Sequence, residues 1–125
     1  MTQARITLGK SGEDLACAAL RRQGYAILAR RYRSRFGEID IIARDGPTLV
    51  FAEVKCRSGA QYGSGAEAIT PRKQQHILRV AQEYLLCHDA AGQPCRFDVV
   101  TVAFDGRARP RVEVIRSAFE AGGAW

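Results

Sequence analysis

The chain has 125 residues, of which 46% are hydrophobic and 26% charged, so it fits one globular domain with a single core. Nineteen Lys and Arg against thirteen Asp and Glu give a formal charge of +6, and most of these cations are Arg. No apolar run is long enough to span a membrane, and the first residues lack the apolar core of a signal peptide. We therefore expect a cytoplasmic protein with no membrane partner. The basic charge favours nucleic acid as the partner, although it could also serve only solubility.

The four cysteines, Cys17, Cys56, Cys87 and Cys95, show no C-x-x-C spacing. They are expected to be buried, reduced thiols, as in cytosolic proteins. A zinc site at Cys87, His88 and Cys95 would lack a fourth ligand at suitable spacing.

The first predicted element is a helix from Ser11 to Gly24, preceded by a loose lead-in over residues 1–9. Ser11 is a typical N-cap, Asp14 follows at capping-box spacing, and Gly24 is a typical helix end. Glu13 lies in the first turn, where an acidic residue is favoured by the helix dipole alone.

A strand predicted over residues 25–32 leads into an arginine-rich segment, R-R-Y-R-S-R-F-G, that contains Arg33 and Arg35. Arginine interleaved with aromatic rings suits a phosphate backbone with exposed bases. A solvated loop with no partner is the alternative interpretation.

Residues 37–57 are predicted to form two strands around a turn at Asp45-Gly46-Pro47. Asp40, Glu53 and Lys55 interrupt these apolar runs, which is the clue to function. Because side chains alternate along a strand, Glu53 and Lys55 share one face. A loop of even length places Asp40 on that face too, and we predict such a loop.

Two carboxylates on facing strands would repel each other unless a cation lies between them. Either the ammonium group of Lys55 or a divalent metal could supply that cation, and hard oxygen ligands suit Mg²⁺ or Mn²⁺ better than zinc. The glycine-rich residues 58–65 that follow are predicted to be a loop that could order on substrate binding.

The strongest helix signal begins at Thr70 as N-cap with Pro71 in the first turn, and runs to His88. Arg72, Lys73 and Gln74 crowd this first turn, where free backbone N–H groups already favour an anion. We expect phosphate contact at this end of the helix.

The C-terminal part is predicted to hold a central strand over residues 95–104, a strand over 111–116 and a helical turn over 117–120. Asp98 interrupts the central strand. It could orient Arg96 or a neighbouring segment, as buried carboxylates commonly do, or it could assist the site at longer range.

The pattern Asp40…Glu53-x-Lys55 resembles the active-site signature of the PD-(D/E)XK nuclease superfamily, which includes restriction endonucleases and Holliday junction resolvases. Five ordered segments extend the resemblance over residues 9–119 to the YraN family of small bacterial proteins: G-E-D-L-A-C-A-A-L-R-R-Q-G-Y, G-E-I-D-I-I, L-V-F-A-E-V-K-C-R, T-P-R-K-Q-Q and C-R-F-D-V-V. The sequence departs from the superfamily signature in having Ile39, not Pro, before the first acid.

The resemblance implies a single-domain restriction-endonuclease-like α/β core, with a mixed sheet of about five strands flanked by helices in the order α-β-β-β-α-β-β. It implies that Asp40, Glu53 and the backbone carbonyl of Val54 bind Mg²⁺ or Mn²⁺, with Glu13 as a weaker further ligand. Lys55 would position the attacking water or stabilise the developing charge.

The implied reaction is phosphodiester hydrolysis by an endonuclease-like enzyme, in DNA, with branched and single-stranded DNA among the options, or in RNA. DNA is favoured over RNA, and a homodimer is compatible with the reaction. The nucleic-acid backbone would be held by Arg33, Arg35, Arg57, Arg72, Lys73 and Gln74. Two alternatives stay open: a non-catalytic nucleic-acid-binding module, and an interaction scaffold with a structural ion pair between Glu53 and Lys55.

Overall fold

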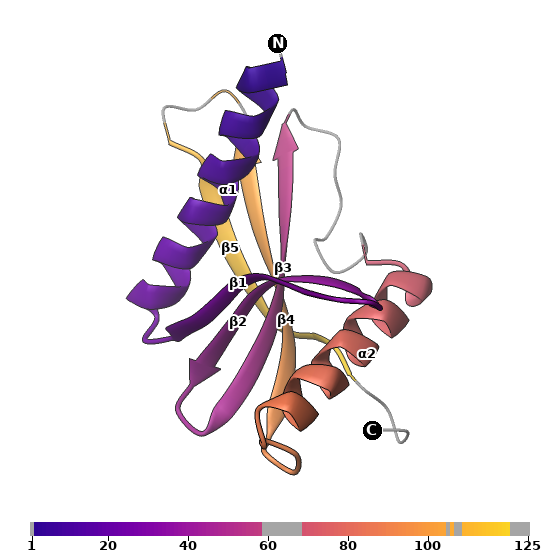
Figure 1. The fold of residues 1–125 in the computed structure, drawn as a ribbon. Helices are drawn as coiled ribbons and strands as arrows, with labels where there is room; N and C mark the ends of the chain where they lie inside the picture. Colours follow the sequence, from indigo (N-terminus) through magenta and orange to yellow (C-terminus); the bar gives the residue numbers. More distant parts are fainter. Residues whose placement is uncertain (1, 59–68, 105, 107–108, 121–125) are drawn as a thin grey trace.

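The computed structural model describes residues 2–58, 69–104, 106 and 109–120. Within them the element order is α1 (Thr2–Arg22), β1 (Ala26–Ser34), β2 (Gly37–Asp45), β3 (Thr48–Ser58), α2 (Pro71–Cys87), β4 (Cys95–Phe104) and β5 (Arg111–Phe119) (Figure 1). The five strands form one sheet in sequence order, in which β3 and β4 are parallel and the other neighbours antiparallel. The predicted α/β class, mixed sheet and element order are confirmed.

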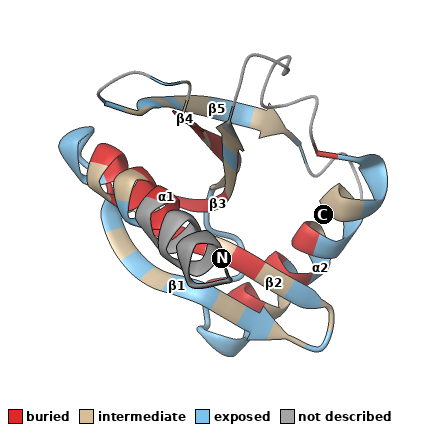
Figure 2. Cartoon of the chain, turned by 90° about the horizontal axis from the view of Figure 1, so that it is seen from above, coloured by how far each residue is buried: buried red, intermediate tan, exposed pale blue. Residues whose placement is uncertain are grey.

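The two helices pack on opposite faces of the sheet, and each covers its own hydrophobic cluster. Buried residues concentrate in the helices and in β2, β3 and β4, whereas the edge strands β1 and β5 are mostly exposed or half-buried (Figure 2). The cluster on the α1 side includes Ala16, Leu20, Ile41, Ala43, Val50, Ala52, Val100 and Val102. The cluster on the α2 side includes Ile39, Ile42, Leu49, Phe51, Ile77, Val80, Phe97 and Val99.

Helix α1 begins at Thr2, so the predicted loose lead-in over residues 1–9 and helix start at Ser11 are wrong. No proline interrupts residues 2–22, so the helix propagates through the cap signal at Ser11. The predicted end is confirmed, because Gly24 has a φ of +92° and its N–H bonds to the carbonyl of Arg21 at 3.0 Å. At Gly12 the helix passes close to β3: an added Cβ would lie 2.1 Å from Sγ of Cys56.

The β2–β3 hairpin has the predicted even-length loop. Asp45 pairs with Thr48 across Gly46 and Pro47, and Gly46 supplies the positive φ that a tight turn needs. Strand β1 runs to Ser34, two residues past its predicted end. Ser34 pairs with Gly37, which closes the β1–β2 hairpin.

Strand β5 extends to Phe119, so the predicted helical turn over residues 117–120 is wrong. The cause is the buried carboxylate of Asp98, which accepts a hydrogen bond from the backbone N–H of Ser117 at 3.0 Å. Ser117 adopts a φ of +53° at a register shift, and pairing then resumes between Phe97 and Phe119. The bulge therefore carries the strand onward where the S-A-F-E sequence alone suggests a helix.

All four cysteines are free, but only Cys17 is buried; Cys95 is half-buried, and Cys56 and Cys87 are exposed. The expectation of uniformly buried thiols is wrong because Cys56 lies near the far end of β3 and Cys87 ends α2. No helix in the described part of the chain combines the length and the apolar content needed to cross a membrane. Residues 59–65 of the predicted substrate loop lie outside the described residues.

Candidate active site

Asp40 and Glu53 meet at a fork in the sheet. The pairing of β2 with β3 ends at Ile41 and Ala52, after which β2 continues along β1 and β3 along β4 (Figure 1). Asp40 and Glu53 are the next residues on each strand. Beyond the last backbone pair, the side chain of Asp40 replaces the ladder: its Oδ2 accepts the N–H of Val54 at 2.8 Å. We call Asp40, Glu53, Val54, Lys55 and Lys73 the fork site.

Glu53 points to the α2 side of the sheet. Its strand neighbours alternate between the two clusters, with Ala52 on the α1 side and Phe51 on the α2 side. Its side chain is only 5% exposed, yet Oε2 has no hydrogen-bond partner within the part of the chain that the structure describes, apart from the carboxyl of Asp40 when that group is protonated. A buried carboxylate oxygen without a partner is costly and calls for a proton or a cation.

The carboxyl of Asp40 titrates abnormally. Burial, then the charge of Glu53, raises its pKa from 3.8 to about 7, and the hydrogen bond from the N–H of Val54 only partly opposes this. Asp40 and Glu53 are therefore close enough to compete for ionisation, as the even-length loop predicts. At pH 7 the carboxyl of Asp40 is therefore about half protonated.

The cation that contacts Glu53 is Lys73, from the first turn of α2. Its Nζ lies 2.7 Å from Oε1 of Glu53. The scaffold hypothesis needs an ion pair between Glu53 and Lys55, whereas the lysine that pairs with Glu53 is Lys73. From the sequence, Lys73 is predicted only to bind phosphate. The Thr70-Pro71 helix start places Lys73 in the first turn of α2, but nothing in the sequence indicates that this turn faces Glu53.

The two lysines affect each other. Burial, then the neighbouring charge of Lys73, lowers the pKa of Lys55. Burial also opposes the charged form of Lys73, but its contact with Glu53 prevails and raises the pKa of Lys73. The fork site thus holds one firmly charged ammonium group and one that gives up its proton more readily than an ordinary lysine.

Glu13 lies on α1 and is buried, but its carboxylate is occupied. Nε of Arg30 and Nε of Arg31 each lie 3.0 Å from one of its oxygens. Among the described residues, no group of three His, Cys, Asp or Glu side chains is placed to hold a metal ion. Glu13 follows Gly12, which passes close to Cys56 on β3, and the carboxylates of both Asp40 and Glu13 add to the effect of burial in raising the pKa of Cys56.

The other predicted phosphate-binding residues differ in how exposed they are and in what they contact. Arg35 and Arg72 are exposed beside α2, and Arg33 is exposed but paired with Glu38 at 3.0 Å. Arg57 is half-buried and follows Lys55 on the same face of β3. Gln74 instead donates its side-chain amide to the carbonyl of Ile69 at 3.0 Å, which fixes the start of α2.

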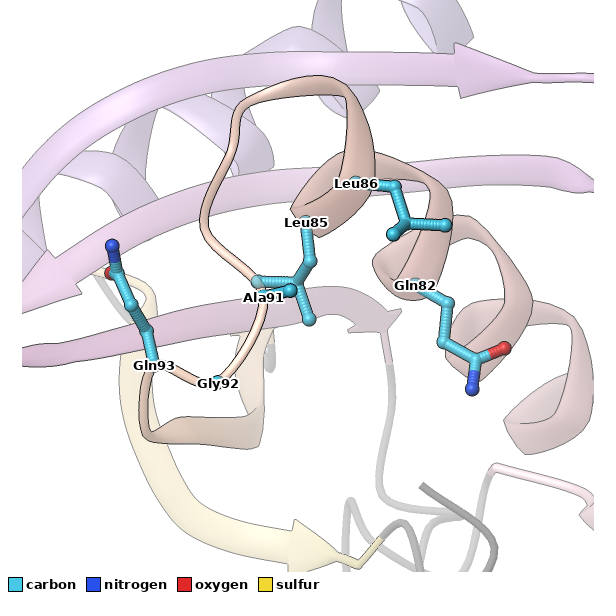
Figure 3. Close-up of a pocket in the computed structure, with 6 residues that line it drawn as sticks. All are labelled: Gln82, Leu85, Leu86, Ala91, Gly92 and Gln93. Atoms are coloured by element: carbon cyan, nitrogen blue, oxygen red, sulfur yellow. The ribbon is translucent and has the colours of Figure 1, made fainter.

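A hollow of about 280 Å³ adjoins the fork site. Gly37 and Glu38 line it from β2, and Arg72, Lys73 and His76 line it from α2. A roomier hollow of about 510 Å³ lies at the other end of α2, between Leu86 and Gly92 (Figure 3). None of the fork-site residues lines that second hollow, so it is separate from the candidate site.

The carboxyl groups of the fork site suit a divalent cation, whereas the charge of Lys73 competes with one. Two converging carboxylates, one with an unpartnered buried oxygen, match the hard oxygen donors that Mg²⁺ and Mn²⁺ prefer. Lys73 supplies one positive charge to the same pair. Asp40 and Glu53 are therefore the residues that would bind the ion, with Glu13 engaged elsewhere.

Comparison with known proteins gives a consistent family assignment. The model of "Uncharacterised protein family UPF0102" matches residues 12–102. A UPF0102 protein of Magnetococcus marinus is 44% identical over 117 residues, covering 93% of this chain and 94% of its own length. One from a Parafrankia species is 50% identical over 112 residues, covering 90% and 95%, and one from Symbiobacterium thermophilum is 46% identical over 114 residues, covering 91% and 97%.

Proposed function

The chain belongs to the UPF0102 family, which is the YraN family expected from the sequence, and we propose that it is a metal-dependent nuclease of the PD-(D/E)XK type. The single observation that carries the proposal is the fork site: two carboxyl groups converge beside two lysines, and one buried oxygen of Glu53 is left without a partner among the described residues.

The cation would be Mg²⁺ or Mn²⁺, bound by Asp40 and Glu53 with the backbone carbonyl of Val54. When bound, it would polarise the scissile phosphate and acidify a coordinated water. The fork is suited to hold it because Asp40 is oriented by the N–H of Val54 and cannot turn away without losing that bond.

The lysines supply the rest of the chemistry. Burial and the charge of Lys73 lower the pKa of Lys55, so Lys55 can position the attacking water and exchange a proton with it more readily than an ordinary lysine. Lys73 retains its charge and can stabilise the negative charge that develops on the phosphate. The substrate is DNA in preference to RNA, and the compartment is the cytoplasm.

A non-catalytic nucleic-acid-binding module is the rival function, and one observation favours it: Lys73 already neutralises Glu53 in the absence of metal. Against it, a site built only to bind phosphate gains nothing from the buried carboxylate of Glu53 and the half-buried carboxyl of Asp40, since negative charges repel the ligand.

A cleavage assay on branched, flapped and single-stranded DNA and RNA, with and without Mg²⁺ or Mn²⁺, tests the proposal. Lys55→Met removes the charge and keeps the length of the side chain, so it should abolish cleavage while retaining nucleic-acid binding. An exposed acid on α1, Asp14, provides the matched control as Asp14→Asn, which should cut like the wild type. Binding without metal-dependent cleavage of any of these substrates would leave only the rival function.

A further inference from the structure

The tip of the β1–β2 hairpin lies directly against α2. An added Cβ at Gly37, whose φ is +140°, would come within 3.8 Å of Cγ2 of Val80 and 4.0 Å of Cβ of His76. The tip is tightened by a hydrogen bond from the N–H of Phe36 to Oγ of Ser34 at 3.0 Å. The hairpin and the helix therefore form a defined seam.

Two hollows follow one another along this seam. The first, of about 280 Å³, has Gly37 and Glu38 on the hairpin side and includes Lys73 of the fork site. The second, of about 410 Å³, has Arg35 and Phe36 on the hairpin side and Arg79 on the helix side. Because residues 35–38 are consecutive, the seam leads from the fork site outward along α2.

The helix side of the seam carries two arginines and a histidine at regular spacing. Arg72, His76 and Arg79 are exposed and lie at positions i, i+4 and i+7, so they share one face of α2. The first of them is in the opening turn of the helix, where unpaired backbone N–H groups add to the attraction for phosphate.

The hairpin side offers a stacking surface. The guanidinium carbon of Arg35 lies 4.9 Å from the centre of the Phe36 ring, and that of Arg79 lies 5.9 Å from it. Aromatic rings and guanidinium planes stack on unpaired bases of any sequence. Phe36 is half-buried, so a base stacked inside a duplex cannot reach it, whereas a base of a single strand can.

Two carboxylates also line the hollows and oppose an anion. Glu38 is neutralised by Arg33 at 3.0 Å. Glu83 lines the outer hollow. The net positive charge of the seam therefore comes from Arg72 at the inner hollow and from Arg35 and Arg79 at the outer one, where Glu83 offsets one charge.

We propose that this seam, formed by Arg35, Phe36, Arg72, His76 and Arg79, binds a single-stranded segment of nucleic acid that leads into the fork site. The inference rests on the proposed nuclease function and narrows its substrate to one with an unpaired strand next to the scissile phosphate. The phosphates lie along α2 and the bases stack toward Phe36.

The test is fluorescence anisotropy in EDTA, where no cleavage occurs, with labelled single-stranded DNA, single-stranded RNA of the same sequence and a blunt DNA duplex. Phe36→Leu keeps the apolar bulk but removes the aromatic face, and Arg79→Gln removes one charge. Arg21→Gln, on the exposed end of α1, is the matched control. Thermal melting verifies that each variant is folded.

Wild-type protein should bind a single strand at least tenfold more tightly than the duplex, and the DNA and RNA arms show which sugar the seam accepts. Phe36→Leu should weaken single-strand binding roughly 5- to 150-fold, the range for loss of one stacked base. Arg79→Gln should lower the salt dependence by about 0.7 in logarithmic slope, the value for one phosphate contact on a single strand. Arg21→Gln should bind like the wild type.

Equal affinity for single strand and duplex, or seam variants that bind like Arg21→Gln, would overturn the proposal that the seam binds a single strand. The proposed function fails in a different way: metal-dependent cleavage would be absent although the seam variants still show their binding defects. Arg79→Gln, at an exposed position, keeps the test valid if Phe36→Leu does not fold.

Discussion

Two buried acids, Asp98 and Glu53, lie one residue apart in the sheet register and on opposite faces of the sheet. They differ in how their negative charges are neutralised. Ala52 pairs with Asp98, and Glu53 pairs with Val99. Asp98, on the α1 side, is fully buried. Glu53, on the α2 side, is almost as buried.

The Asp98 centre is saturated. Its carboxylate accepts hydrogen bonds from the hydroxyl of Tyr25 at 3.1 Å, the N–H of Ser117 at 3.0 Å and Nε of Arg96 at 3.0 Å. Arg96 also pairs with Asp45 at 3.0 Å, so the network joins β2, β4, β5 and the start of β1. These contacts favour the structural role that the sequence left open for Asp98.

The fork site is unsaturated. One oxygen of Glu53 contacts Lys73 while the other has no partner among the described residues, and Asp40 carries a raised pKa beside it. The comparison teaches that burial alone does not mark a functional acid. The buried acid whose bonds are incomplete is the candidate for chemistry.

The largest expected effect is on the saturated centre. Asp98→Ala should destabilise the fold by about 3–5 kcal/mol, because it leaves Arg96 and the N–H of Ser117 without their buried partner. Chemical denaturation measures this, with the exposed Asp14→Ala as control, expected to change stability by less than about 1 kcal/mol. A loss from Asp98→Ala no larger than the control's would remove the distinction between the two centres.

In contrast to Asp98→Ala, Asp40→Asn should lower activity and leave stability unchanged. It keeps the shape of the side chain and removes the charge, so metal-dependent cleavage should fall by about 10²–10³-fold, the usual cost of losing one charge-stabilising group. The fold should not be weakened. A single-turnover assay paired with thermal melting measures both, and a variant that cuts normally would contradict the assignment of Asp40.

These outcomes bear on what the sequence could predict. Strand periodicity and an even-length loop were enough to place Asp40 and Glu53 together, because they fix which side chains share a face. The helix start at Thr70-Pro71 could be predicted from its capping residues. The contact between Lys73 and Glu53 could not be predicted because it joins residues twenty positions apart on two different elements, and no local rule sets how α2 packs on the sheet. The course of β5 was missed because the buried acid on β4 decides it.

The stability of the protein should depend on pH through Asp40. Folding raises the pKa of Asp40 from 3.8 to about 7, so the folded state holds the proton more tightly than the unfolded state. That contribution to stability is complete below pH 4 and is lost as the pH rises through 7. Without metal, the wild type should therefore lose on the order of 2 kcal/mol between pH 5 and pH 8.5 relative to Asp40→Asn. Parallel stability profiles for the two proteins would show that folding does not raise the pKa of Asp40.

The smallest expected effect concerns Lys73. Lys73→Met should cost about 1 kcal/mol of stability, because the lysine is 43% exposed and its ion pair is partly screened by water. The same change removes a positive charge next to the acids, so it should strengthen Mg²⁺ binding several-fold while weakening cleavage. Mg²⁺ affinity that falls in this variant would mean that Lys73 supports the cation site and does not compete with it.

The most direct test of the fork site is calorimetric titration of Mg²⁺ and Mn²⁺ at pH 8 into the wild type, Asp40→Asn, Glu53→Gln and the control Asp14→Asn. The account predicts that the wild type and Asp14→Asn bind the ion, and that each fork variant binds it at least tenfold more weakly or not at all. A wild type that binds neither ion, or fork variants that bind as well as the control, would contradict it.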